Sequence, residues 1–220
     1  MAERFVAGYT VASGALSGLV GARTLQGADL LRGVDEDFVE DLTATLDLEE
    51  EELISLLDEI FSGELQEEHA SEYLRVLELI LVARCNKLES ELELVLTYYL
   101  PNDTSGRWNP VLAALGMSTL AKQFGETTLA FPWKHVSNVI WPGVMAFTPA
   151  KLRVLRVELD GDWRGRLQAL PVGLLINADS DWDPAECRTE LEEGLSTLST
   201  WVDVALSRNE GLILWMDGDQ

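Results

Sequence analysis

The sequence predicts an α+β fold, rich in helix, with a small sheet that contains the N-terminal and C-terminal strands. Apolar residues form a short strand-like run over residues 5–11 and continue without interruption over residues 211–216, and both patterns are typical of strands. Between them, apolar residues recur at helical spacing in several long segments. Because no internal repeat or low-complexity linker divides the 220 residues, we expect residues 1–220 to form a single domain.

A short first helix is predicted directly after the N-terminal strand. Ser13 is placed to cap it, apolar residues recur through Val20, and Gly21 stands near its end. Asp35 is then expected to open a second helix.

The strongest helix patterns follow. Asp47 and Glu50 resemble a capping box, and the apolar residues after them repeat at helical spacing up to Gly63, which supplies the stop. A fourth helix is predicted from about residue 68 to residue 88, with one apolar stripe along it.

The middle of the chain gives weaker signals. Residues 91–96 alternate and predict either a strand or the end of the preceding helix. Residues 101–106 are a turn region, and the Asn-Pro pair at 109–110 predicts a short helix that ends at Gly116. Residues 131–149, rich in Pro and Trp, are predicted to form an ordered, irregular loop over the core.

The C-terminal third is predicted to hold two helices and the last strand. The Thr-Pro pair at 148–149 signals the start of a helix over residues 151–159, although the alternation there also fits a strand. Residues 161–165 are predicted to form a turn. Pro184 occupies the first position of a long helix with an apolar face, and residues 211–216 form the closing strand.

Charge is distributed unevenly along the chain. The formal net charge is −22, and residues 35–68 carry fifteen carboxylates but no Lys or Arg. A surface this negative repels nucleic acid and anionic lipid and attracts basic proteins. We therefore expect neither a nucleic-acid partner nor a membrane partner. Solubility, or adaptation to a salty cytoplasm, is the alternative explanation of the charge.

Motifs for catalysis and metal binding are absent from the sequence. No GxGxxG or GxxxxGK[ST] loop, GxSxG elbow, HxxxH, HxH or CxxC spacing occurs, so we predict no cofactor and no metal site. Asp179, Asp181 and Asp183 resemble the start of a calcium loop, but Pro184 stands where that loop needs a glycine turn. An acidic helix start is the preferred interpretation.

Few side chains qualify as nucleophiles or proton-transfer groups. Cys85 and Cys187 are far apart in sequence and are predicted to be packing or surface groups without a disulfide. His69 is expected to be solvated at a helix end, whereas His135 lies among aromatic residues. Since neither a signal peptide nor a long apolar run is present, the protein is predicted to be cytoplasmic.

Tryptophans supply candidate anchors for a partner. Three of the seven, Trp133, Trp141 and Trp163, lie in predicted loops or turns among basic residues. Exposed aromatic side chains of this kind serve as anchors at protein interfaces. Burial at the edge of the core is the alternative for each of them.

Several short apolar blocks occur in an order that resembles a known family. The blocks are residues 6–11, 16–21, 60–65, 73–80, 100–103, 108–116 and 211–215. Their order is similar to that in an uncharacterised, mainly actinobacterial family of domain-of-unknown-function proteins, over nearly the whole chain. The resemblance implies a single domain and a bacterial origin, and it implies no activity.

The function that these observations favour is non-enzymatic binding of a basic protein. An immunity protein against a bacterial toxin would have this size, this charge and this lack of motifs. The candidate partner-binding residues are Glu49, Glu50, Glu51, Glu52, Glu64, Glu67, Glu68, Trp133 and Trp141. One alternative is a component that self-assembles through amphipathic helices. Another is an enzyme that uses His135 and a carboxylate in residues 131–149. The oligomeric state is left open.

Overall fold

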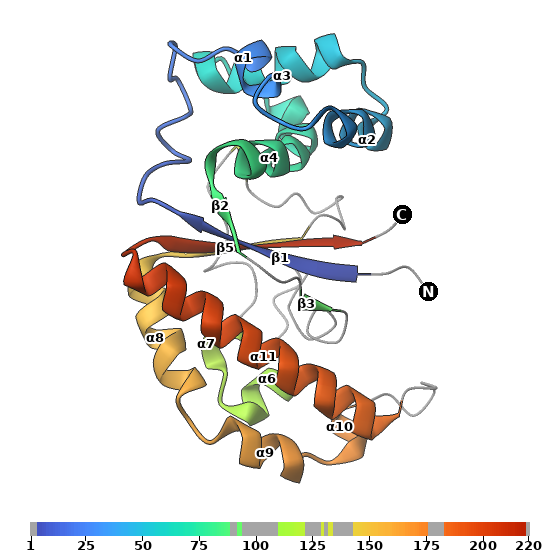
Figure 1. Ribbon diagram of the computed structural model, residues 1–220, viewed down its shortest axis with the longest axis vertical. Helices are drawn as coiled ribbons and strands as arrows, with labels where there is room; N and C mark the ends of the chain where they lie inside the picture. Colours follow the sequence, from blue (N-terminus) through green and yellow to red (C-terminus); the bar gives the residue numbers. More distant parts are fainter. Residues whose placement is uncertain are drawn as a thin grey trace.

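The computed structural model of the chain describes residues 4–88, 92–93, 110–121, 129, 132–133, 143–175 and 183–218. In this part of the chain, an antiparallel sheet has the strand order β2-β1-β5-β4, and β3 also pairs with β1. The strands are β1 (Arg4–Val11), β2 (Asn86–Lys87), β3 (Leu92–Glu93), β4 (Gly143–Phe147) and β5 (Gly211–Gly218). The predicted α+β fold is confirmed (Figure 1).

The first and last strands are neighbours in the sheet, as predicted. β1 and β5 pair along their whole length, from Arg4 opposite Gly218 to Val11 opposite Gly211. β4 pairs with the other edge of β5, so β5 is an inner strand. The two ends of the described chain therefore lie side by side.

Helices cover both faces of the sheet, in two groups that follow the order of the chain (Figure 1). One face carries the N-terminal layer: α1 (Gly27–Leu31), α2 (Glu36–Leu46), α3 (Glu50–Ser62), the 3₁₀ helix η1 (Glu67–His69) and α4 (Ala70–Arg84). The other face carries the C-terminal layer: α6 (Pro110–Leu115), α7 (Ser118–Ala121), α8 (Pro149–Leu159), α9 (Trp163–Ala169), α10 (Val172–Leu175) and α11 (Pro184–Ser207).

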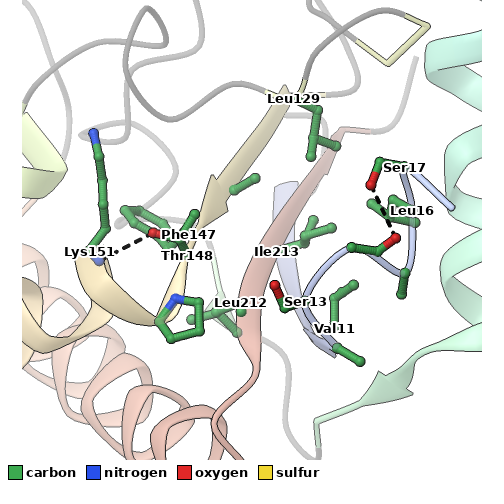
Figure 2. A pocket seen from close by; sticks show the side chains of 16 residues that line it. Val11, Ser13, Leu16, Ser17, Leu129, Phe147, Thr148, Lys151, Leu212 and Ile213 are labelled. Atoms are coloured by element: carbon green, nitrogen blue, oxygen red, sulfur yellow. Dashed lines mark hydrogen bonds between the residues drawn. The ribbon is translucent and has the colours of Figure 1, made fainter.

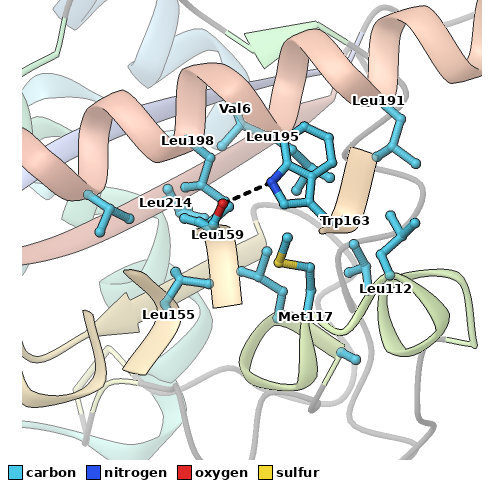
Figure 3. Close-up of a cluster of buried hydrophobic side chains, with 14 of the residues drawn as sticks. Val6, Leu112, Met117, Leu155, Leu159, Trp163, Leu191, Leu195, Leu198 and Leu214 are labelled. Carbon is cyan, nitrogen blue, oxygen red and sulfur yellow. Dashed lines mark hydrogen bonds between the residues drawn. The ribbon is translucent and has the colours of Figure 1, made fainter. Parts of the chain in front are cut away.

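The two faces of the sheet supply two hydrophobic clusters. Val6 and Leu214 pack with the C-terminal layer beneath α11 (Figure 3), whereas Tyr9 and Trp215 pack with the N-terminal layer. Because helices cover both faces, residues 212–216 of β5 are all buried. This burial explains why that strand is apolar throughout instead of alternating.

Residues 13–21 form a series of turns, so the helix predicted to start at Ser13 is wrong. Gly14 and Gly21 have φ of +78° and +77°, and this left-handed conformation interrupts a right-handed helix. Turn hydrogen bonds between residues three apart, such as Ala15 N–H to the carbonyl of Ala12 at 3.0 Å and Leu19 N–H to the carbonyl of Leu16 at 3.1 Å, occur in this segment.

Two further elements differ from the prediction. β4 lies inside residues 131–149, which were expected to be irregular, because a short strand buried on both faces shows no alternation. α9 begins at Trp163, where a turn was expected. The Asp162 side chain accepts the Gly165 N–H at 3.2 Å and so caps this helix.

Helix boundaries in the N-terminal layer are also corrected. Asp35 caps α2, as predicted, by accepting the N–H of Asp37 at 3.1 Å. Asp47 ends α2 with φ of +54°, so the capping box predicted at that residue is wrong. Gly63 ends α3 in the left-handed conformation, as predicted. α4 ends at Arg84, four residues earlier than expected.

The remaining helix predictions are confirmed where residues are described. α6 is followed by Gly116 with φ of +85°, and the segment 151–159 is helical, not a strand. Asp183 caps α11 by accepting the Ala185 N–H at 2.8 Å. Residues 101–106 and Asn109 lie outside the described residues. The single-domain organisation of residues 1–220 stays a prediction.

Candidate functional site

The carboxylates of residues 35–68 lie on the surface of the N-terminal layer. Fourteen of the fifteen are exposed, and Glu59 is the half-buried exception. The predicted partner-binding glutamates are all exposed. We call them the acidic surface: Glu49, Glu50, Glu51, Glu52, Glu64, Glu67 and Glu68.

The acidic surface divides into two groups, one at each end of α3. Residues 49–52 form the start of α3, whereas Glu64 follows its end and Glu67 and Glu68 belong to η1. α3 contains 13 residues, which corresponds to a length of about 20 Å. A partner therefore contacts both groups only if its surface spans that length.

Two members of the acidic surface also stabilise α3. The Glu52 carboxylate accepts a hydrogen bond from the backbone N–H of Glu49 at 2.9 Å, as in a capping box. Carboxylates in the first helical turn also interact favourably with the helix dipole. Substitution of Glu49 or Glu52 would therefore change helix stability as well as surface charge.

Glu59 of α3 is the centre of a hydrogen-bonded network. Its Oε2 accepts a hydrogen bond from the hydroxyl of Tyr73 and lies 2.9 Å from His69 Nδ1. Its Oε1 accepts from Gln66 Nε2 at 3.1 Å, and the Tyr73 hydroxyl accepts from the backbone N–H of Gln66 at 2.9 Å. The network joins α3, η1 and α4.

The environment of this network changes the pKa of two groups. The hydrogen bond to Glu59 raises the pKa of His69 above its ordinary value, and burial raises the pKa of Tyr73 to about 12. The Tyr73 phenol therefore stays protonated and donates to Glu59. His69 lies at the end of η1, as predicted, and its side chain is 34% exposed and contacts Glu59. In the sequence, the four-residue spacing of His69 and Tyr73 was the one weak indication that these side chains lie on the same side of a helix. No pattern in the sequence distinguished Glu59 from the other carboxylates.

The predicted aromatic anchors lie inside the protein where they are described. Trp133 is 3% exposed and packs in the cluster of the N-terminal layer, so its ring is not available to a partner. Trp163 is 1% exposed and donates its indole N–H to the carbonyl of Leu159 at 3.0 Å (Figure 3). Trp141 and His135 lie outside the described residues.

Arginines of the C-terminal layer are engaged locally. Arg156 pairs with Asp160 at 3.1 Å and with Asp203 at 2.8 Å. Arg164 pairs with Glu192 at 3.3 Å and stacks 4.2 Å from the centre of the Trp163 ring. These contacts balance the positive charges of Arg156 and Arg164, two of the basic residues that lie near the candidate tryptophans in the sequence.

Neither cysteine is in a disulfide, and neither is an activated nucleophile. Burial, with a smaller contribution from Glu210, raises the pKa of the Cys85 thiol to about 11. Burial also raises the pKa of Cys187, which lies in α11. Thiols with a raised pKa carry little thiolate at neutral pH, and the thiolate is the reactive form.

Among the described residues, no group of three or more His, Cys, Asp and Glu side chains is arranged to hold a metal ion. Asp183 of the predicted calcium-loop pattern caps α11, whereas Asp179 and Asp181 lie outside the described ranges. No helix in the described part of the chain combines the length and hydropathy that crossing a membrane requires.

A cavity opens at the end of the sheet where β1 ends and β5 begins (Figure 2). Its volume is about 330 Å³. It is lined by residues 11–17, Leu129, residues 146–149 with Lys151, and residues 211–213. The sequence alone does not reveal this cavity, because four segments remote from one another in the sequence form it together.

No profile of a known protein family, no curated protein and no solved structure matches this chain. The resemblance noted in the sequence therefore stays a resemblance.

Proposed function

We propose that this chain is a non-enzymatic binding protein that captures a basic protein partner on its N-terminal layer. The observation that carries the proposal is the exposure of fourteen carboxylates in residues 35–68, a segment without Lys or Arg. A surface whose charges all have the same sign accelerates the approach of an oppositely charged partner and selects against partners that carry charge of the same sign.

The folded arrangement supports this proposal. Crowded carboxylates repel one another, so they lower the stability of the free protein. The cations of a basic partner would relieve this repulsion at both ends of α3. The finer form of the proposal is an immunity protein whose carboxylates block the basic cleft of a toxin. Self-assembly and catalysis in residues 131–149 stay alternatives.

The test begins with the immobilised protein and a lysate of its native host at low and at high salt. Retained proteins are identified by mass spectrometry, and the dissociation constant of the retained partner is then measured. Two variants each remove charge at one end of α3: Glu50→Gln with Glu51→Gln, and Glu67→Gln with Glu68→Gln. Glu49 and Glu52 are kept because they stabilise α3.

A matched control removes two exposed carboxylates from α11 in the other layer, Glu186→Gln with Glu193→Gln. We expect each α3-end variant to weaken binding by about tenfold at low salt, and the control by less than about twofold. Equal weakening by all three variants would show that net charge alone matters. Unchanged affinity in both α3-end variants would reject the acidic surface as the binding site.

A further inference from the structure

One side of α8 packs against α11 and the sheet, and the opposite side is apolar and faces solvent. The buried side consists of Leu152, Leu155 and Leu159. On the opposite side, Val154 is 55% exposed and Val157 is 72% exposed, the two highest values among the large apolar side chains of the described residues. Figure 1 shows α8 at the outer edge of the C-terminal layer.

Packing within one copy of the protein does not explain these two valines. Valine forms helices less well than alanine or most charged residues, and these side chains gain little from burial. Single exposed apolar residues are ordinary on protein surfaces. Here, however, Val154 and Val157 lie one helical turn apart, and Ala150, also exposed, lies one turn before Val154. We call these three residues the α8 face, and their spacing of four and three residues is typical of helices that pack on one another.

The charges beside the α8 face are complementary to those of a second copy of the same helix. Arg153 and Asp160 are both exposed and seven residues apart, which is almost two full helical turns, so they lie on the same side of the face. When two copies of α8 pack in opposite directions, Val154 lies opposite Val157 of the other copy, and Arg153 lies opposite Asp160 of the other copy. Two-fold symmetry forms each of these contacts twice.

Contacts within one copy leave both charges available for this pairing. Arg153 donates a hydrogen bond to the amide oxygen of Asn209 at 3.2 Å, and a neutral amide does not compensate a guanidinium. Arg156 lies 3.1 Å from Asp160 and 2.8 Å from Asp203, so one cation serves two carboxylates. Asp160 is 61% exposed in its side chain and can accept a second cation.

The position of α8 also favours contact between copies. The net charge of −22 makes two copies repel each other, and the exposed carboxylates of residues 35–68 lie on the other face of the sheet (Figure 1). α8 carries three basic residues and one carboxylate, so contact through α8 keeps the acidic surfaces of the two copies apart.

The size of α8 limits the strength of such a contact. α8 contains 11 residues, which corresponds to a length of about 16 Å. A stable interface buries about 800 Å² on each partner, and one helix of this length supplies less than that. The contact is therefore weak.

We propose that α8 forms a weak, reversible, two-fold symmetric dimer of this chain, in which two copies of the helix pack antiparallel through the α8 face. No residue of the acidic surface belongs to α8. The dimer therefore goes beyond the capture of a basic partner and leaves the acidic surface exposed.

The test is sedimentation equilibrium of the full chain. We expect the average mass to rise from near that of the monomer at about 10 µM to near that of the dimer at about 1 mM, with a dissociation constant on the order of 0.1 mM. Raising sodium chloride from about 0.02 M to about 0.5 M should strengthen the dimer several-fold, because it screens the repulsion between the two copies. Capture of a basic partner should weaken over the same range, so the two proposals are tested separately.

The first pair of variants tests the α8 face. Val157→Glu places a charge within the contact and should weaken the dimer by about tenfold or more. Val172→Glu is the matched control, because it places the same charge at a valine of α10 that is 46% exposed and outside the α8 face. It should weaken the dimer by less than about twofold.

A second pair of variants tests the antiparallel direction. Arg153→Asp places like charges opposite each other and should weaken the dimer by about tenfold. The combination of Arg153→Asp with Asp160→Arg keeps the net charge of the parent and restores the pair with its roles exchanged. Its dissociation constant should therefore return to within about twofold of the parent value. Far-UV circular dichroism of each variant checks that the fold is retained.

Three results would each overturn the proposal. An average mass that stays monomeric at about 1 mM would exclude the dimer. Equal weakening by Val157→Glu and Val172→Glu would show that net charge, not the α8 face, determines association. Failure of the combined variant to regain affinity over Arg153→Asp would exclude the antiparallel arrangement.

Discussion

One carboxylate, that of Glu59, joins three segments of the N-terminal layer. It accepts hydrogen bonds from α4 through Tyr73 and from the segment before η1 through Gln66, and it contacts His69. Its side chain is 17% exposed, in contrast to the exposed carboxylates around it. Burial of a carboxylate costs little free energy when several donors bond to it. Glu59 therefore positions η1 and is not part of the exposed charge.

The contact between His69 and Glu59 makes stability depend on pH. The pKa of His69 in the folded state lies above its ordinary value of 6.5, chiefly because of the hydrogen bond to Glu59. The stabilisation is therefore complete below about pH 6.5 and is lost as the pH rises through the folded-state pKa. We expect His69→Gln to lower the free energy of unfolding more at about pH 5.5 than at about pH 9, as measured by urea unfolding.

The carboxylates that face His69 are those of Glu59, Glu68 and Glu72. Repeating the measurement in a Glu59→Gln background isolates the first of them, and the pH dependence of the His69→Gln effect should then largely disappear. A destabilisation by His69→Gln that is the same at both pH values would show that the imidazole contributes by packing alone.

At the scale of elements, the contact between β1 and α11 depends on one glycine. A Cβ at Gly8 would lie 2.6 Å from the ring of Trp201, a residue of α11 that is 2% exposed. A side chain at residue 8 would therefore push α11 away from the sheet.

We expect Gly8→Ala to lower the free energy of unfolding by about 1–3 kcal/mol, because the ring of Trp201 is rigid and enclosed. Gly173 of α10 is the matched control, since nothing lies within 4 Å of a Cβ placed there. Gly173→Ala should leave the free energy unchanged or raise it by up to about 1 kcal/mol. Urea unfolding measures the free energy of unfolding of both variants. Equal changes in that free energy would contradict the role of the Trp201 contact.

At the scale of the whole molecule, the two layers differ in how charge is balanced. Residues 4–88 contain eighteen carboxylates and six Lys or Arg residues, and fourteen of the carboxylates are exposed in residues 35–68. In the C-terminal layer, Arg156 and Arg164 form ion pairs with neighbouring helices. Repulsion is therefore concentrated on one side of the sheet.

This repulsion predicts that simple salt stabilises the protein. Raising sodium chloride from about 0.02 M to about 0.5 M shortens the screening length from more than 20 Å to less than 5 Å, so we expect the melting temperature to rise. Chloride is preferred to sulfate, because sulfate stabilises most proteins by exclusion from their surface. A melting temperature that is constant or falls would show that the carboxylates do not destabilise the folded state.

The sequence by itself determined the fold class and most of the regular elements. The strands at the two ends of the chain, the helices α2, α3, α4, α6, α8 and α11, the cap at Asp35 and the helix start at Pro184 follow from local patterns, because periodicity and capping depend on neighbours in the chain. Exposure of the glutamates at both ends of α3 follows from the same patterns.

Only the tertiary structure decided which residues meet. The sequence did not predict β4, because burial on both faces removes the alternation of apolar and polar residues. It also did not predict the turns at residues 13–21, because these depend on the left-handed conformations of Gly14 and Gly21. The burial of Trp133 and Trp163, the network at Glu59 and the cavity beside Lys151 each join segments remote in the chain. Such contacts depend on how the helical layers pack against the sheet, and the spacing of residues in the sequence does not specify which remote side chains then lie together.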